Sequence, residues 1–261
     1  MSHHAFPLVR RPCAALLALA LFTGLAGCKD KPATDTAAAE PAAAPNLADA
    51  ARPAAMAEQA KEAARAQLPK GDPNTPAGNY LDIDSGNQIM FAYLSIAGMP
   101  IDYNEVAGNY SRDYTATSDE FKKNDLLKAL KTKIDAGVAQ AAGQRYVKLE
   151  VADSVGKYDF DKKGFPLDSS VWEKGSYRYF NDNGGYKIGF NNGAQFRYLS
   201  VPEEDKARVI EGLRSKYEAM RTVVYGYVQD ADVSKKVVLA QILKIELTDK
   251  NGNILATQTV Q

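Results

Sequence analysis

Beyond residue 28 the chain contains neither histidine nor cysteine. Both histidines, His3 and His4, and one of the two cysteines, Cys13, lie near the N-terminus, and the other cysteine is Cys28 itself. A domain without thiols and imidazoles forms no disulfide framework and no Cys/His metal site. It also lacks the groups for Ser-His-Asp or Cys-His catalysis and for a histidine pH switch. We therefore expect no metal and no cofactor.

The chain also lacks an excess of charge of one sign, with 32 basic and 32 acidic side chains. Residues 1–27 contain Arg10 and Arg11 but no acid, so the rest of the chain carries 30 basic and 32 acidic groups, a net charge of about −2. Proteins that bind nucleic acids concentrate Lys and Arg on one face. The charge balance therefore predicts no nucleic-acid partner.

Long hydrophobic runs are absent except at the N-terminus. The apolar segment from Cys13 to Leu25 follows two arginines and is shorter than the ~20 residues that a helix needs to span a bilayer. This pattern predicts a signal peptide over residues 1–27 and not a transmembrane helix.

The tetrapeptide Leu25–Cys28 resembles the lipobox of bacterial lipoproteins, in which a peptidase cleaves before the cysteine after its thiol has been acylated. The resemblance implies that Cys28 becomes the N-terminus and carries fatty acyl chains such as palmitate, which attach the protein to a membrane. Two or three such chains hold a protein firmly, because each buried methylene contributes ~0.8 kcal/mol. Lys29 stands where an inner-membrane retention signal carries Asp, which favours the outer membrane, on the side that faces the periplasm.

Residues 28–76 are rich in Ala and Pro and contain almost no large apolar side chains. Such a segment cannot form a core, so we expect a lipidated, disordered tether in which Ala54–Gln67 forms a fraying helix. The tyrosines and the single tryptophan all come later in the chain. The sequence thus predicts one globular domain over residues 77–261.

Helical patterns come first in this domain and strand patterns later. We predict a helix capped by Ser85, a short helix over residues 102–110, and a long helix that Thr117 and Glu120 open as a capping box. Ser200 and Glu203 are predicted to form a second capping box, with a further helix after it. Strands are predicted over residues 146–151, 158–160, 177–180, 186–190, 195–199, 223–230, 237–248 and 254–260. This order predicts an α+β fold in which N-terminal helices pack on a mostly antiparallel C-terminal sheet.

Two groups of acidic residues are weak candidates for chemistry. Asp159, Asp161 and Gly164 have the spacing of an EF-hand loop, but Lys163 occupies the fifth position, where a ligand oxygen is required. The acids at 203–205 lie in the first turn of a predicted helix, where they stabilise the helix dipole. Neither group predicts a metal site or a catalytic carboxylate pair.

Aromatic residues on the three predicted short strands form a candidate binding surface. Tyr177, Tyr179, Tyr186 and Tyr198 combine a flat apolar ring with a polar tip, which suits the recognition of sugars or peptides. The same side chains also stabilise antiparallel sheets as cross-strand pairs without any ligand. This structural interpretation is the one we favour.

Three segments, residues 85–93, 157–166 and 207–211, resemble a family of uncharacterised proteobacterial lipoproteins that carry a domain of unknown function. The resemblance covers about Tyr80 to the C-terminus. It implies a lipoprotein domain but assigns no catalytic residue.

Taken together, the sequence predicts a membrane-anchored periplasmic lipoprotein with a non-enzymatic binding or structural role in the cell envelope. Its partner would be an envelope protein or peptidoglycan. Two alternatives stay open: an envelope hydrolase that uses carboxylates, and a carrier of a small apolar ligand.

Globomycin, which inhibits the peptidase that processes lipoproteins, should cause a precursor that retains residues 1–27 to accumulate in the native host. Mass spectrometry of treated and untreated cells measures this shift. A precursor mass that does not respond to globomycin would contradict the predicted lipid anchor and the localisation that depends on it.

Overall fold

Two long neighbouring strands organise the domain, which is described by a computed structural model that covers residues 53–260. The helices are α2 (Pro53–Ala66), α3 (Gly86–Ile96), α4 (Tyr103–Tyr110), α5 (Arg112–Ala116), α6 (Glu120–Gly143) and α7 (Glu204–Ser215). The strands are β1 (Leu81–Asp82), β2 (Tyr146–Val151), β3 (Gly164–Pro166), β4 (Lys187–Phe190), β5 (Tyr198–Ser200), β6 (Met220–Asp232), β7 (Val237–Asp249) and β8 (Ile254–Thr259).

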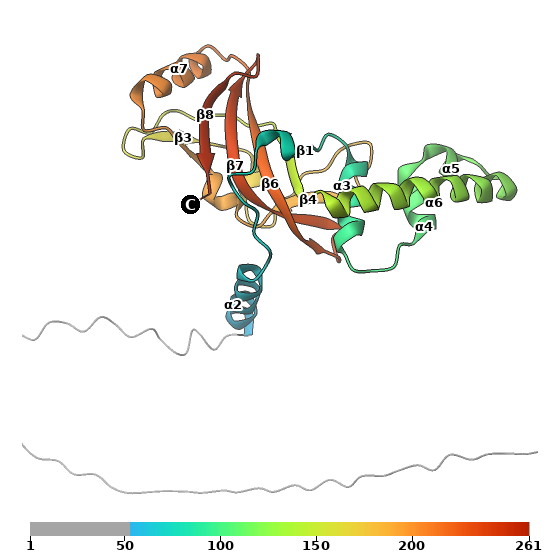
Figure 1. Ribbon diagram of the computed structural model, residues 1–261. Helices are drawn as coiled ribbons and strands as arrows, with labels where there is room; N and C mark the ends of the chain where they lie inside the picture. The colour runs from blue at the N-terminus through green and yellow to red at the C-terminus, as the bar shows by residue number, and fades with distance from the viewer. Residues whose placement is uncertain (1–52, 261) are drawn as a thin grey trace, which may run out of the picture. The chain divides into compact units, whose positions relative to one another are not determined.

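The main sheet has the order β1-β2-β6-β7-β4, with β8 also paired to β7 (Figure 1). Strands β2, β6, β7 and β8 pair antiparallel, whereas β1 is parallel to β2 and β4 is parallel to β7. Because β6 occupies one edge of β7 along its whole length, β4 and β8 share the other edge. The predicted α+β fold with a mostly antiparallel sheet is confirmed.

The two faces of the sheet bury different side chains. Successive residues of a strand point to opposite faces, so Val224 and Tyr225 lie on opposite sides of β6. Val224 belongs to the main core, whereas Tyr225 packs with Tyr80 and Leu243 in a smaller cluster on the other face. In this cluster the Tyr80 and Tyr225 rings meet edge-on, with their centroids 5.0 Å apart.

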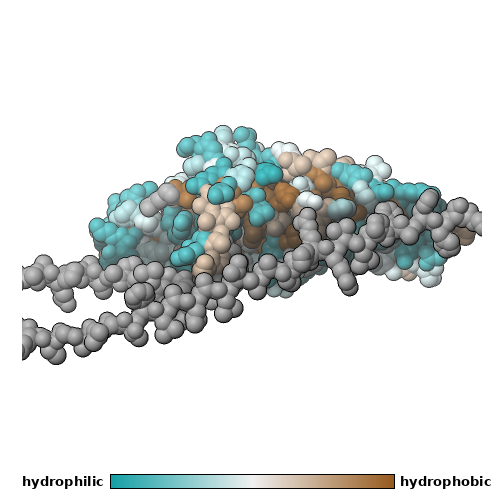
Figure 2. Space-filling view, turned by 90° about the horizontal axis from the view of Figure 1, so that it is seen from below, coloured by the Kyte–Doolittle hydropathy of each residue, from teal (hydrophilic) through white to brown (hydrophobic). Residues whose placement is uncertain are grey.

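The main core lies between the sheet and α3, and α6 packs against α3. Helix α3 is apolar on nearly every side, and its residues Ile89, Met90 and Tyr93 are fully buried. Helix α6 is much longer, and with α4 and α5 it forms an arm at one end of the domain (Figure 1). Seen from below, hydrophobic side chains gather near the middle of the domain, between ends that are mostly hydrophilic (Figure 2).

Helix α3 begins at a cap that two distant segments build together. Ser85 and Gln88 form the capping box within the helix, so the predicted cap at Ser85 is confirmed. Asp182 adds a second cap: its carboxylate accepts hydrogen bonds from the Ser85 hydroxyl at 2.6 Å and from the Gly86 N–H at 2.9 Å. The buried Asn183 also donates to Asn87 at 3.0 Å. The turn at 181–185 therefore fixes the start of a helix almost a hundred residues earlier.

Other local predictions were wrong in detail. Asp119, not Thr117, caps α6: its carboxylate accepts hydrogen bonds from the N–H groups of Phe121 at 2.9 Å and Lys122 at 3.1 Å. The predicted capping box of Ser200 with Glu203 does not form either: Glu203 is the N-cap of α7, and no side chain caps this helix.

The three short strands predicted over residues 177–199 do not form a meander. Only Arg178 and Ile188 form a bridge, residues 193–196 form a 3-10 helix, and β5 pairs with β3. The Asn- and Gly-rich turns between these segments do not make them pair with one another. Strand β4 pairs with β7 instead, and β5 pairs with β3.

The segment before the first strand lies on the tyrosine side of the sheet. The Gln229 amide donates to the Pro69 carbonyl at 2.8 Å, and the Asp72 N–H donates to the Tyr146 hydroxyl at 3.0 Å. Contacts with the domain therefore start before residue 77. Cys28, the predicted signal peptide and residues 28–52 lie outside the described residues. Within residues 53–260, no helix combines the length and the apolar composition needed to cross a bilayer.

Asp182→Ala should lower the free energy of unfolding by about 1 kcal/mol at neutral pH, as expected for the loss of a helix cap. Partial burial alone would raise the pKa of Asp182, but the hydrogen bonds from Ser85, Gly86 and Asn87 outweigh it and hold that pKa below its ordinary value. The carboxylate thus stabilises the fold above its unfolded-state pKa of about 3.9, and this contribution is lost as the pH falls through the folded-state pKa.

Urea unfolding of the natural chain and of Asp182→Ala at pH 7 and pH 3 tests this cap. The stability difference should shrink at pH 3. Asp182→Asn, which keeps an acceptor oxygen, is the control and should lose less at pH 7. A difference that stays the same at both pH values would contradict the role assigned to the carboxylate.

Candidate functional site

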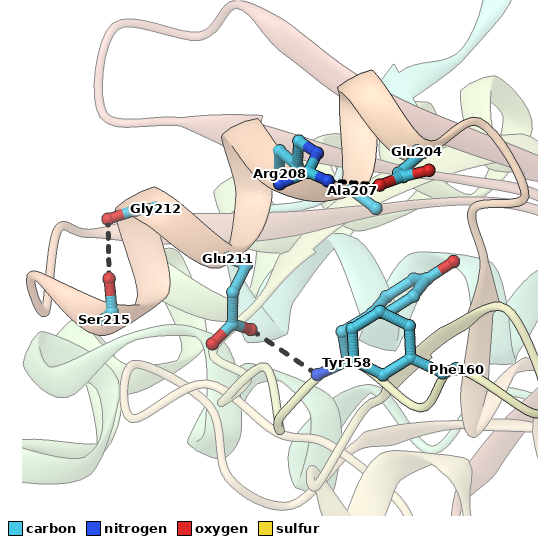
Figure 3. A pocket seen from close by; sticks show the side chains of 8 residues that line it. All are labelled: Tyr158, Phe160, Glu204, Ala207, Arg208, Glu211, Gly212 and Ser215. Atoms are coloured by element: carbon cyan, nitrogen blue, oxygen red, sulfur yellow. Dashed lines mark hydrogen bonds and ion pairs between the residues drawn. The ribbon is translucent and has the colours of Figure 1, made fainter.

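A groove of about 430 Å³ lies between α7 and the turn that follows β2 (Figure 3). Six residues of α7 and two aromatic residues line it: Tyr158, Phe160, Glu204, Ala207, Arg208, Glu211, Gly212 and Ser215. Its walls are mainly apolar, and charged side chains stand along its rim.

Helix α7 faces the core with one side and the groove with another. Ala207 and Ile210 are buried and hold the helix on the domain. Glu204, Arg208, Glu211 and Ser215 follow the spacing of one helical stripe, which extends about 16 Å along the axis. The helix packs in this way because Ala207 and Ile210 lie on its core side, whereas Val209 on another side is 55% exposed.

The second wall is an aromatic row that runs from the core to the surface. Phe165 is fully buried and contacts Tyr158, with ring centroids 5.0 Å apart. Tyr158 is anchored by its hydroxyl, which donates to the Val201 carbonyl at 3.1 Å. Phe160 meets the Tyr158 ring edge-on at 5.0 Å, and 80% of Phe160 is exposed. The Phe160 ring is thus exposed to solvent, and its contact with the hydrogen-bonded Tyr158 ring restricts its position.

The acids of the groove are paired with bases. Glu204 forms an ion pair with Arg208, and Arg214 donates through Nε to Glu211 Oε2 at 2.9 Å. The Tyr158 N–H also donates to Glu211 Oε2, at 3.4 Å. The hydrogen bond from Arg214 is the main reason why the pKa of Glu211 lies below its ordinary value. Glu211 is therefore ionised at neutral pH and is poorly suited to act as a general acid.

No lining residue is arranged as an activated nucleophile. The Ser215 hydroxyl donates to the Gly212 carbonyl at 3.1 Å, so its proton is directed to the helix backbone. The described chain supplies no imidazole to act as a base. The groove thus combines apolar side chains with charged groups that are already paired.

Gly212 keeps the groove open. Glycine inside a helix costs about 1 kcal/mol relative to alanine, so it needs a reason. At Gly137 of α6 the reason is packing, because a Cβ there would lie 2.7 Å from the Phe91 ring. At Gly212 a Cβ would meet nothing within 4 Å. The fold does not require this glycine, whereas a side chain at this position would enter the groove.

The structure does not bring the four predicted tyrosines onto one surface. Tyr177 and Tyr179 are both exposed. Tyr186 is buried against Tyr93, and burial raises its pKa to about 12. Tyr198 lies half-buried on β5, in the small sheet, and its hydroxyl donates to the Gly164 carbonyl at 2.9 Å. The four-residue surface is corrected accordingly, because Tyr177 and Tyr179 lie outside the strands, Tyr186 is buried just before β4, and Tyr198 belongs to β5 of the small sheet.

Two of the acids that the sequence analysis judged weak candidates, Asp159 and Glu203, form hydrogen bonds or ion pairs within the domain. The Asp159 carboxylate accepts from the N–H groups of Asp161 and Lys162, each at 3.0 Å, and so closes a tight turn. Glu203 pairs with Lys206 in the first turn of α7. Over residues 53–260, no three His, Cys, Asp or Glu side chains are grouped so that they could hold a metal ion.

Sequence reasoning missed the groove. It treated residues 158–160 as a strand and α7 as an amphipathic helix, without linking them. Gly212 was the available signal, because a glycine in the middle of a helical pattern often has a packing or functional reason.

No protein-family model matches the chain, and the comparisons with curated proteins and with solved structures give no match either. The resemblance to a lipoprotein family stays a prediction.

Gly212→Ala should raise the free energy of unfolding by about 0.5–1 kcal/mol, because alanine favours the helix and has room for its methyl group. The matched control is Gly137→Ala, which should destabilise the domain because its methyl group would collide with Phe91. Chemical denaturation measures both. A destabilised Gly212→Ala variant would show that the glycine serves the fold and not the groove.

Proposed function

We propose that this protein is a lipid-anchored envelope lipoprotein with a non-enzymatic binding role, and that the groove beside α7 receives a protein partner. The anchor would be the lipid on Cys28, and the domain would face the periplasm from the outer membrane. The lipobox-like tetrapeptide at Leu25–Cys28 and the apolar run before it support this location.

The observation that carries the binding role is the exposed Phe160 beside the open space at Gly212. Interfaces draw most of their energy from a few large side chains that fill well-defined pockets. Phe160 is such a side chain, and Tyr158 restricts its motion, so ordering it on binding costs little. The space over Gly212 can accept an apolar side chain from the partner.

The chemistry of the groove favours a protein partner over peptidoglycan. Ala207 and Gly212 line the groove, and neither has a side chain that can form a hydrogen bond. A sugar surface needs many polar partners, whereas here the nearest charged groups already pair with one another. An apolar protein side chain over Gly212 would leave no polar group of the groove unsatisfied.

The same features speak against the two alternative functions. A carboxylate hydrolase needs one acid with a raised pKa, and the pKa of Glu211 is lowered instead. A carrier of a small apolar ligand encloses most of that ligand, whereas this groove is open to solvent.

A photo-crosslinking amino acid at position 160, in the full chain in native envelopes, should capture a defined protein partner that mass spectrometry identifies. The same amino acid at Phe121 is the matched control, because Phe121 is also exposed, at 87%, but lies on α6. Phe160→Ser should reduce chemical crosslinking to that partner at least about tenfold, and Phe121→Ser should not. Equal capture at both positions would refute the proposed binding surface.

A further inference from the structure

Strand β8 runs along one side of the main sheet, and its outer edge lacks the usual protection (Figure 1). Free strand edges attract other chains, so proteins shorten them, charge them or cover them. Of the other two edge strands, β1 has only two residues, one of them Asp82, and β4 is covered where Arg178 bridges to Ile188. Strand β8 has six residues, none of them charged and none of them proline. Within residues 53–260 it pairs with β7 alone, so its outer edge is free.

Two residues of β8 direct their main-chain groups outward. The Val260 N–H donates to the Leu243 carbonyl of β7 at 2.8 Å. Successive residues of a strand turn their N–H and C=O groups to opposite edges. Those of Thr257 and Thr259 therefore point away from β7, and both residues are exposed. Together they are a template on which another strand can form.

The edge of the small sheet faces the same space. The Val201 N–H donates to the Lys163 carbonyl at 2.9 Å, so the main-chain groups of Ser200 point away from β3. The Ser200 N–H donates instead to the side-chain amide oxygen of Gln258 on β8, at 2.9 Å. The free edges of β5 and β8 therefore border one cleft.

This cleft has a volume of about 290 Å³. Thr257 and Thr259 of β8 line it, as does Ser200 of β5. The buried residues Val201 and Ala256 also line it and offer apolar contact. Proteins that bind extended peptides use this combination, in which the main chain forms the hydrogen bonds and the pockets receive alternate side chains.

The Gln258 side chain indicates which chemical group this cleft accepts. Its amide accepts the hydrogen bond from Ser200 and donates through Nε2 to the Gln195 carbonyl at 3.4 Å. A side-chain amide has the same donor and acceptor as a peptide bond. It thus already makes, on the β5 edge, a hydrogen bond of the kind that an added strand makes. The two charged lining residues, Glu203 and Lys206, pair with each other, so charge does not select the ligand.

We infer that the outer edge of β8 binds an extended segment of a partner protein, which adds to the main sheet as a further strand. The main-chain groups of Thr257 and Thr259 pair with those of the segment, and one of its side chains contacts Val201 and Ala256. A lipid or a glycan does not match this row of N–H and C=O groups, whereas an extended peptide repeats them at the same spacing. The inference does not rest on the proposed function, because this cleft is separate from the groove beside Phe160.

Random octapeptides displayed on phage are the probe, selected on the full chain purified in detergent. Selected peptides should bind as strands, so that every second amide faces β8. N-methylation of that set of amides should weaken binding at least about tenfold, and N-methylation of the other set less than about twofold. Bound peptide should also slow hydrogen exchange within residues 254–260, which mass spectrometry measures.

Thr257→Pro should weaken binding of the selected peptides at least about tenfold, because it removes an outward N–H but keeps the pairing with β7. Ser118→Pro is the matched control and should bind as the natural chain does. Ser118 is exposed, lies before α6, and follows Thr117, whose extended backbone suits a following proline. Urea unfolding shows whether both variants are folded, and the N-methylation comparison decides alone if Thr257→Pro is not.

Four results would overturn the inference. One is a library that yields no binding peptide, and another is equal sensitivity to N-methylation of either set of amides. The third is hydrogen exchange within residues 254–260 that bound peptide leaves unchanged. The fourth is a set of peptides that lose binding to Phe160→Ser but keep it to Thr257→Pro, which would leave the proposed function intact. Failure of the proposed function itself would show separately, as equal capture at positions 160 and 121.

Discussion

The pairing of β6 with β7 is the contact on which the rest of the domain depends. Each strand has thirteen residues, and they pair along their whole length. Strand β2 adds to the free edge of β6, and β4 and β8 divide the free edge of β7 between them. One face of the pair carries the main core under α3, and the other carries the tyrosine cluster around Tyr225. Loss of this pairing would remove both cores at once.

The groove is a consequence of how α7 connects to this frame. The helix links the short strand β5 to the first residue of β6, so both of its ends are fixed. Ala207 and Ile210 attach it to the core, and its charged stripe is left beside the Tyr158–Phe160 turn. A helix held at both ends needs less intrinsic stability, so it can tolerate Gly212. The side chains that line the groove therefore lie on an element whose two ends are fixed.

Several features were predictable because their causes are local. The Ser85 cap depends on residues within one helical turn, and the long strands show their pattern within a single segment. The tyrosines were less predictable. Tyr177 and Tyr179 alternate as expected for an exposed extended segment, but nothing near Tyr186 in the sequence indicates that α3 will cover it. Burial of that side chain depends on Tyr93, which comes much earlier in the chain.

The sequence by itself determined the chemical limits of this protein and most of its helices and long strands. A domain without histidine and cysteine excludes whole classes of chemistry wherever its residues lie in space. Tertiary structure alone decided that Asp182 caps α3, that the four tyrosines separate, and that Phe160 stands beside Gly212. The physical reason is that these contacts join segments separated by tens of residues. Their geometry follows from the pairing of the whole sheet, which no local pattern encodes.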